Sequence, residues 1–248
     1  MNLHERMKQY EAVSQTYLMR RTPVIIRLDG VAFHTFTKKF DKPFDDMFGR
    51  AMRHVTHQLV DNIQGCVIGY TQSDEISLAL QDYKNLDTDA WFGYNVQKLV
   101  SVSAKMATYE FYKAFENVLC GHDPNRCLSI YWPALKENNV GFDSRCFNLP
   151  FEEVNNYFVD RQRDAEKNSI NLLAQQYYTQ EQLNGINTKK LQDKLFTEQG
   201  VNWNDLPIEQ KRGFVYIPKS NPKFEEYNRF TPVFSQEPEF VNSLIRFD

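Results

Sequence analysis

Three carboxylates in two short motifs are the residues best suited to chemistry in this sequence. Asp29 closes the run VIIRLDG, and Asp74 and Glu75 stand together in QSDEISL. Neighbouring carboxylates repel one another, which raises their pKa values unless a cation neutralises them. Mg²⁺ takes oxygen ligands and commonly shares its shell with substrate phosphates. If the fold brings the two motifs together, they predict a site for two Mg²⁺ ions that carries out nucleotidyl transfer.

Hydrophobic periodicity divides the first 150 residues into strands and helices. After a helix over 4–21, the pattern predicts the order β-α-β-β-α-β, which is the split βαβ (ferredoxin-like) arrangement of an α+β fold. The expected strands are 24–30, 66–72, 75–81 and 142–150, and the expected helices between them are 45–63 and 94–118.

The connections between these elements predict that the two motifs meet. Only Ser73 and Asp74 separate the second and third strands, so these strands are expected to pair as a tight hairpin. Right-handed crossovers put the third strand between the first and second, and Asp29 then lies beside the hairpin tip. Strict alternation sends Asp74 and Glu75 to opposite faces, so we expect Asp74 to bind metal and Glu75 to support it.

The residues after Asp29 are suited to holding phosphate. Gly30 tolerates positive φ and Ala32 is small, so backbone N–H groups could approach a triphosphate there. His34 is near enough in sequence to reach a phosphate. Lys42 and Lys98 could each supply a positive charge to it.

The pattern becomes mainly helical after Pro150. A long helix is expected over 151–178, shorter ones near 188–198 and 207–212, a strand over 213–218, and then an extended, partly structured tail. We therefore expect a palm-like catalytic core over 1–150 and a helical extension with a terminal strand and tail over 151–248.

Composition narrows the class of protein. With 248 residues, a net charge of −3 and a pI of about 6.0, the chain is not a typical bulk nucleic-acid binder. No stretch is long and apolar enough to span a membrane, and the N-terminus has no apolar signal core. Four cysteines without a leader are expected to stay reduced, so we expect a cytoplasmic protein with no membrane partner.

Several blocks together resemble the tRNA-histidine guanylyltransferase family of 3′–5′ nucleotide-adding enzymes, which have a polymerase-like palm. The blocks are TPVIIRLDGVAFHTFTKKFDKPFDD, GYTQSDEISL, YNVQKLVSVSA, FDSRCFNLP, RQRDAEKNSI and GVNWNDLP. The resemblance implies that Asp29, Asp74 and the Gly30 carbonyl hold two Mg²⁺ ions. It implies a nucleotide-binding set of Asp29, Gly30, Val31, Ala32, Phe33, His34, Lys42, Ser73, Asp74 and Lys98.

Two differences from the sequence pattern of the eukaryotic members indicate which branch of the family the chain is similar to. Eukaryotic members carry Arg-Gly where this chain has Val31-Ala32, and His-Ile-Asn-Asn where it has residues 166–169 (EKNS). The chain is thus similar to the bacterial, archaeal and phage like-protein branch. This branch implies templated repair of 5′-truncated tRNA, and the alternative is addition of a single G to tRNA-His.

The resemblance also implies a mechanism and partners. A 5′-monophosphate RNA end attacks the α-phosphate of ATP or GTP, and the 3′-hydroxyl of an incoming NTP then attacks the activated end. We expect Arg161, Arg163, Lys167 and Lys190 to contact tRNA phosphates, which positions the RNA without reading its sequence. Related enzymes are tetramers, so a homotetramer is expected.

Two other functions remain open from the residues. A nucleotidyl cyclase uses a similar palm and acidic corner, and SDEISL loosely resembles its GGDEF hairpin, although the paired glycines are missing here. A non-catalytic RNA-binding palm protein is the alternative outside enzymes. The intact Asp29, Asp74 and Glu75 disfavour it.

Overall fold

A five-stranded antiparallel sheet forms the centre of the computed structural model, in the order β4-β1-β3-β2-β5. The structure describes residues 1–122, 124–221, 227, 228 and 230–246, with only the backbone described for 117–122. The strands are β1 (Val24–Val31), β2 (Cys66–Gln72), β3 (Glu75–Leu80), β4 (Gly141–Asn148) and β5 (Phe214–Tyr216).

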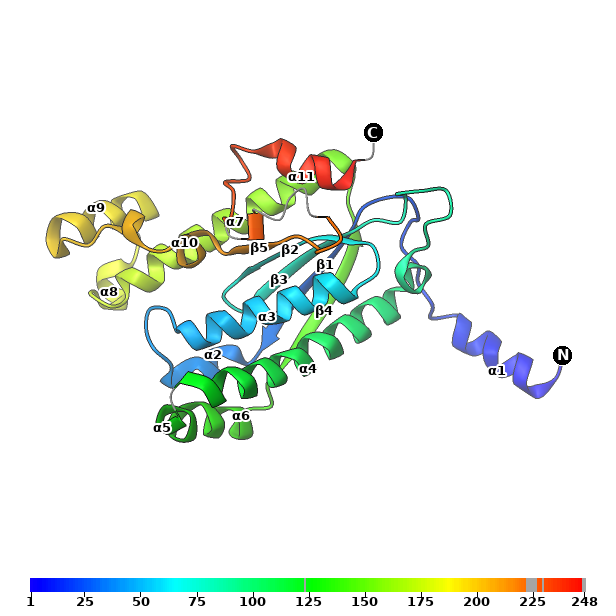
Figure 1. Cartoon of the computed structure of the whole chain (residues 1–248), viewed down its shortest axis with the longest axis horizontal. Helices are drawn as coiled ribbons and strands as arrows, with labels where there is room; N and C mark the ends of the chain where they lie inside the picture. The colour runs from blue at the N-terminus through cyan, green and yellow to red at the C-terminus, as the bar shows by residue number, and fades with distance from the viewer. Residues whose placement is uncertain (123, 222–226, 229, 247–248) are drawn as a thin grey trace.

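Helices cover both faces of this sheet (Figure 1). The helices of the first half are α1 (Leu3–Ala12), α2 (Phe33–Phe36), α3 (Asp46–Asn62), α4 (Val96–His122), α5 (Pro124–Arg126) and α6 (Trp132–Glu137). Those of the second half are α7 (Phe151–Ala174), α8 (Gln180–Leu183), α9 (Thr188–Gln199), α10 (Ile208–Arg212) and α11 (Pro238–Ile245). Short 3₁₀ or π segments lie at Thr37–Lys39, Trp91–Tyr94, Cys127–Tyr131 and Trp203–Asp205.

The split βαβ prediction is confirmed. β3 lies between β1 and β2, and β4 pairs with the other edge of β1. The tight hairpin between β2 and β3 is present, with Gln72 opposite Glu75. The end of β1 consequently lies beside the start of β3, where Asp29 is opposite Glu75.

Alternation along β1 separates two cores. Val24, Ile26 and Leu28 are fully buried against α3 and α4, whereas Ile25 faces the opposite side of the sheet. There it joins side chains of α7 and α11, such as Phe158 and Val241. Burying apolar side chains on both faces favours folding by about 1.5–3 kcal/mol per large side chain and makes the sheet a rigid support.

The C-terminal part shares this second core and adds β5 to the sheet beside β2. A smaller third core, which includes Leu191, Leu195 and Trp203, lies where α9 packs on the end of α7. The proposed division at residue 150 remains a prediction. No helix in the described ranges combines the length and apolar character needed to cross a lipid bilayer.

Two expectations about where helices end are wrong. The expected helix over 4–21 ends at Ala12, because the Thr16 carbonyl instead accepts from the Val96 N–H at the start of α4. The helix expected to continue to 178 ends at Ala174. The tail, expected to be extended and partly structured, contains one helix that was not predicted, α11, which begins at Pro238 and buries an apolar face on the sheet.

Candidate active site

The two carboxylate motifs meet at one corner of the sheet. Asp29 on β1 is directly opposite Glu75 on β3, and the Gly30 N–H donates to the Asp74 carbonyl at 3.1 Å. Asp29 is four residues after Ile25, so its side chain points to the α7 face of the sheet. Cross-strand neighbours have Cβ atoms about 5 Å apart, which brings Asp29 and Glu75 close together.

Electrostatics at this corner favours a bound cation. Partial burial raises the pKa of Asp74, and the nearby charge of Asp29 raises it further. A divalent cation between these groups would offset both effects. Among the described residues, no three His, Cys, Asp or Glu side chains form a complete metal site. The available donors fit Mg²⁺, which keeps waters and accepts substrate oxygens to fill its shell.

Glu75 makes a different set of contacts. Its carboxylate lies 3.3 Å from Arg161 of α7 and 3.9 Å from Arg27 of β1. Burial raises the pKa of Glu75, and the charges of both arginines oppose that increase. Glu75 therefore links the hairpin to α7, in keeping with the supporting role expected for it.

The loop after Asp29 has a strained backbone, but not at Gly30. Gly30 lies within β1, and a Cβ there would be 2.4 Å from the Phe33 ring, so glycine is required for close approach. Positive φ occurs instead at Ala32 (61°) and at Ser73 (54°) of the hairpin. Such angles are uncommon outside glycine and cluster at functional sites.

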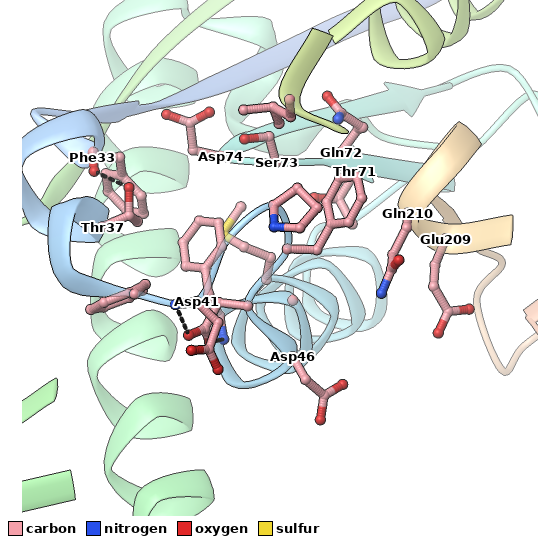
Figure 2. A pocket seen from close by; sticks show the side chains of 18 of the residues that line it. Phe33, Thr37, Asp41, Asp46, Thr71, Gln72, Ser73, Asp74, Glu209 and Gln210 are labelled. Atoms are coloured by element: carbon pink, nitrogen blue, oxygen red, sulfur yellow. Dashed lines mark hydrogen bonds between the residues drawn. The ribbon is translucent and has the colours of Figure 1, made fainter. Parts of the chain in front are cut away.

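A cavity of about 380 Å³ opens on one side of the hairpin tip (Figure 2). Ser73 and Asp74 form one wall, Asp41 and Asp46 lie across from them, and Gln210 closes a side. Five phenylalanine rings and a methionine in its lining give it an apolar surface: Phe33, Phe40, Phe44, Phe48, Phe214 and Met52.

A second cavity, of about 680 Å³, opens on the other side of the hairpin, towards α7. Its lining is mainly polar and includes Asp29, Asp74 and Glu75. Gln72, Ser73, Asp74 and Leu172 line both cavities. The hairpin tip therefore separates two spaces that share its carboxylate Asp74.

The predicted nucleotide-binding residues in and after the loop that follows Asp29 differ in how exposed they are. His34 and Lys42 are exposed at the first cavity, where the Lys42 ammonium donates to the Thr37 carbonyl at 3.2 Å. Phe33 is a buried wall residue whose ring packs 5.1 Å from Phe111 between centroids. Val31 is 46% exposed beside this loop.

Lys98 is not brought to either cavity within one chain. Lys98 lies four residues after Tyr94, and the Tyr94 carbonyl accepts from the Leu18 N–H. The N–H of the next residue, Met19, donates to the side chain of Asn148. Asn148 pairs with Val24 at the start of β1. Asp29 lies five residues further along that strand, about 16 Å away.

The predicted RNA-binding residues also differ in their surroundings. Arg163, Lys167 and Lys190 are exposed. Arg161 is only 16% exposed in its side chain and is held by Glu75, Asp160 and Asp164. Its guanidinium pairs with Glu75 of the acidic corner, so any RNA contact by Arg161 would compete with these ion pairs.

Asp143 lies at the site but was not predicted as a site residue from the sequence. It lies opposite Asp29 on β4 and forms an ion pair with Arg145 at 3.2 Å. Asp143, Asp29 and Glu75 thus form one row across three strands. The strand over 142–150 was expected, but its register against β1 was not, and register alone would have placed Asp143 there.

Comparisons with known proteins identify the family. The family described as tRNAHis guanylyltransferase (Thg1) matches residues 4–150. A bacterial tRNA(His) guanylyltransferase (Thg1)-like protein in complex with ATP is 39% identical, with a TM-score of 0.87 over 99% of this chain and 100% of that chain. A bacterial Thg1-like protein in complex with GTP is 37% identical, with a TM-score of 0.78 and 99% of both chains covered.

A curated relative gives the same result. The tRNA(His) guanylyltransferase of Schizosaccharomyces pombe is 27% identical over 97% of this chain and 90% of its own length. The family match covers more than half of the 248 residues, and the structural similarity extends over nearly all of them. The chain belongs to the tRNA-histidine guanylyltransferase family.

Proposed function

We propose that this chain is a two-metal 3′–5′ nucleotidyltransferase that adds NTPs to the 5′ end of tRNA. Family membership supports nucleotidyl transfer to tRNA as its activity. The observation that carries the site assignment is that Asp29 and Asp74 line the second cavity together, while Asp74 also lines the first.

In this proposal, Asp29, Asp74 and the Gly30 carbonyl hold two Mg²⁺ ions. When bound, these ions would lower the pKa of an attacking hydroxyl and stabilise the charge on the leaving group. Burial raises the pKa of Asp74 and the charge of Asp29 adds to the rise, and a cation bound between the two carboxylates would counter both effects. Asp143 and Glu75 extend the negative charge on either side of Asp29.

The chain's own groups position the nucleotide. The apolar surface of the first cavity is suited to a purine ring, and the relatives in complex with ATP and GTP support this use. The Phe33 and His34 N–H groups donate to no described carbonyl and are available to phosphate oxygens. His34 and Lys42 add donors at the same rim.

Two displacements would then occur at one corner. The RNA 5′-phosphate attacks the α-phosphorus of ATP and releases pyrophosphate. The 3′-hydroxyl of an incoming NTP next attacks the RNA 5′-phosphorus, and AMP leaves. We propose truncated tRNAs as the substrates, with selection of the NTP by a template base. The similarity to bacterial Thg1-like proteins supports this branch.

A 5′-extension assay tests the proposal. Labelled tRNAs that lack one or more 5′ nucleotides are incubated with ATP, NTPs and Mg²⁺, beside intact tRNA-His that lacks only G at position −1. Extension of many truncated tRNAs is expected. Extension of tRNA-His alone would favour the single-G alternative, and a cyclic product from GTP without RNA would favour the cyclase.

The assembly and location are also proposals. We propose a homotetramer in the cytoplasm. The exposed apolar side chains Leu3, Met7 and Tyr10 on one side of α1 support association, because α1 buries no residue within its own chain.

A further inference from the structure

Three amide side chains line the α7 wall of the second cavity. Asn168 and Asn171 of α7 and its C-cap residue Gln175 follow one another at i, i+3 and i+7, and because Gln175 keeps a helical backbone conformation the three lie on one face. Within the described part of the chain, none of the three side-chain amides makes a hydrogen bond. Each retains two N–H donors and a carbonyl acceptor for a ligand.

This amide wall faces the acidic corner. Asp29, Ser73 and Asp74, from β1 and the hairpin tip, line the same cavity. A molecule that fills the cavity therefore contacts both the amides and the carboxylates. The cavity volume of about 680 Å³ leaves room for more than a single water or ion.

The charges in the cavity indicate which part of a nucleotide fits the amide wall. Among the described lining residues, Arg161 is the only basic one, and it is held by Glu75 at 3.3 Å and Asp164 at 2.9 Å. No cation is left to hold a phosphate at this wall. Neutral amides instead suit the uncharged hydrogen-bonding groups of a nucleoside, namely the ribose hydroxyls and the base edge.

We propose that Asn168, Asn171 and Gln175 form a nucleoside-binding wall next to the reacting phosphate. The inference rests on the proposed function and extends it to this cavity. Purine N3 and pyrimidine O2 are acceptors common to all base pairs, so amide donors can hold a nucleoside without selecting its base. Selection by a template base and binding by the amide wall are therefore compatible.

The nucleoside has two possible sources, the incoming NTP and the terminal nucleotide of the RNA. Equilibrium binding of each is measured separately in Mg²⁺, with unreactive 3′-deoxy-GTP for the first and a 5′-triphosphorylated tRNA acceptor hairpin for the second. The variants are Asn171→Ala, Gln175→Ala and the double variant. Gln176→Ala is the matched control, because Gln176 follows Gln175 just after the end of α7, is exposed, and is not in the cavity lining.

Each single variant is expected to weaken binding of one ligand about fivefold, and the double variant about 20-fold, since each loses hydrogen bonds to an uncharged partner. The control should stay within about twofold, and the thermal midpoints should be unchanged. The ligand that is weakened identifies the source. A double variant that binds both ligands within about twofold of wild type overturns the inference, whereas wild-type protein that binds neither overturns the proposed function as well.

Discussion

The carboxylate of Glu75 forms ion pairs with arginine side chains and is mostly shielded from solvent. Arg161 reaches it from α7, 86 positions later in the chain, and also binds Asp160 and Asp164. The hydroxyl of Ser77, two residues along the same strand, pairs with Tyr157 of α7 at 2.8 Å. These contacts hold the face of the hairpin strand against α7 and so keep the second cavity beside Asp29.

A double-mutant cycle measures this link. Glu75→Gln and Arg161→Met should each lower the free energy of unfolding by about 1–2 kcal/mol, because each leaves a partly buried charge less well paired. The double variant should lose less than the sum, with a coupling of about 1 kcal/mol in urea denaturation. Strict additivity would show that the ion pair does not join hairpin and helix.

The key residues differ in how far the sequence reveals them. Asp29 and Asp74 could be brought together because hairpin length and crossover handedness determine their relative position. The partner of Glu75 could not, since an ion pair across 86 residues depends on how α7 crosses the sheet. Gly30 was expected to tolerate a positive φ, but the positive φ occurs at Ala32, and glycine is needed at position 30 because a Cβ there would meet the Phe33 ring.

At the scale of elements, the segment that precedes α3 is tied to the region after α4. Asp45 caps α3 by accepting from the Phe48 N–H at 3.0 Å, and its other oxygen accepts from the Tyr131 hydroxyl at 2.8 Å. Arg126 binds Asp41 of the same segment at 2.5 Å. Because Asp41 and Asp45 line the first cavity, these contacts hold its outer wall in place.

Tyr131→Phe should loosen that wall without touching the acidic corner. The loss of one hydrogen bond to a carboxylate predicts a KM for ATP about three- to tenfold higher, with kcat within about twofold. Tyr109→Phe is the matched control, since Tyr109 is 63% exposed on α4 and is not in the cavity lining. A lower kcat with unchanged KM would contradict this role for the segment.

The contact between α3 and β5 makes the fold sensitive to acid. The His57 ring stacks on Tyr216 with centroids 3.9 Å apart, and no described residue accepts from or donates to its buried Nε2. Burial lowers the pKa of His57 from 6.5 to about 4, despite the nearby Asp61. The other charged groups facing it are His54, Lys219 and Arg53.

The unfolded chain takes up a proton at His57 below pH 6.5, whereas the folded chain does so only near pH 4. Stability should therefore fall as the pH falls through this interval, by up to about 3 kcal/mol from this group. Urea denaturation at pH 7.5 and pH 5.0 measures the difference. His57→Phe should reduce it and His4→Gln should not, because His4 is exposed on α1. An equal pH dependence in wild type and His57→Phe would contradict the assignment.

The order and type of the central elements were predictable, because alternation and helical periodicity are strong in β1–β3 and α3. The ends of these elements were harder to predict, because tertiary contacts determine where a helix or strand stops. Tyr17 fits a helical apolar stripe yet forms a bridge with Asn95, which ends the helical region before it. α11 was not predicted because prolines occur around it in the sequence, although it has an apolar face that is buried: Phe240, Val241, Leu244 and Ile245.

At the scale of the whole molecule, α1 stands apart from the body of the protein (Figure 1). Its Leu3, Met7 and Tyr10 are 65%, 47% and 69% exposed and lie on one side of the helix at i, i+4 and i+7. Contiguous exposed apolar side chains commonly mark an interaction surface. The chain's own fold does not depend on this helix, because α1 has no buried residue.

Charges on the apolar side of α1 should reduce assembly without unfolding the chain. Leu3→Asp combined with Met7→Asp is expected to shift the mass measured by sedimentation velocity towards the monomer. The thermal midpoint extrapolated to low protein concentration should change little. Gln9→Asp adds a similar charge off the stripe and should leave the mass unchanged. A wild-type mass in the double variant would exclude α1 from the subunit contact.

Metal binding at the acidic corner is the most direct test of the account. Mn²⁺ binding to the full chain is followed by electron paramagnetic resonance with and without ATP, in wild type and in the Asp29→Asn, Asp74→Asn double variant. Asp193→Asn on α9, outside both cavity linings, is the control. We predict two bound ions per wild-type or control chain with ATP, and loss of both in the double variant. The same number of ions in all three proteins, or none in wild type, would contradict the account.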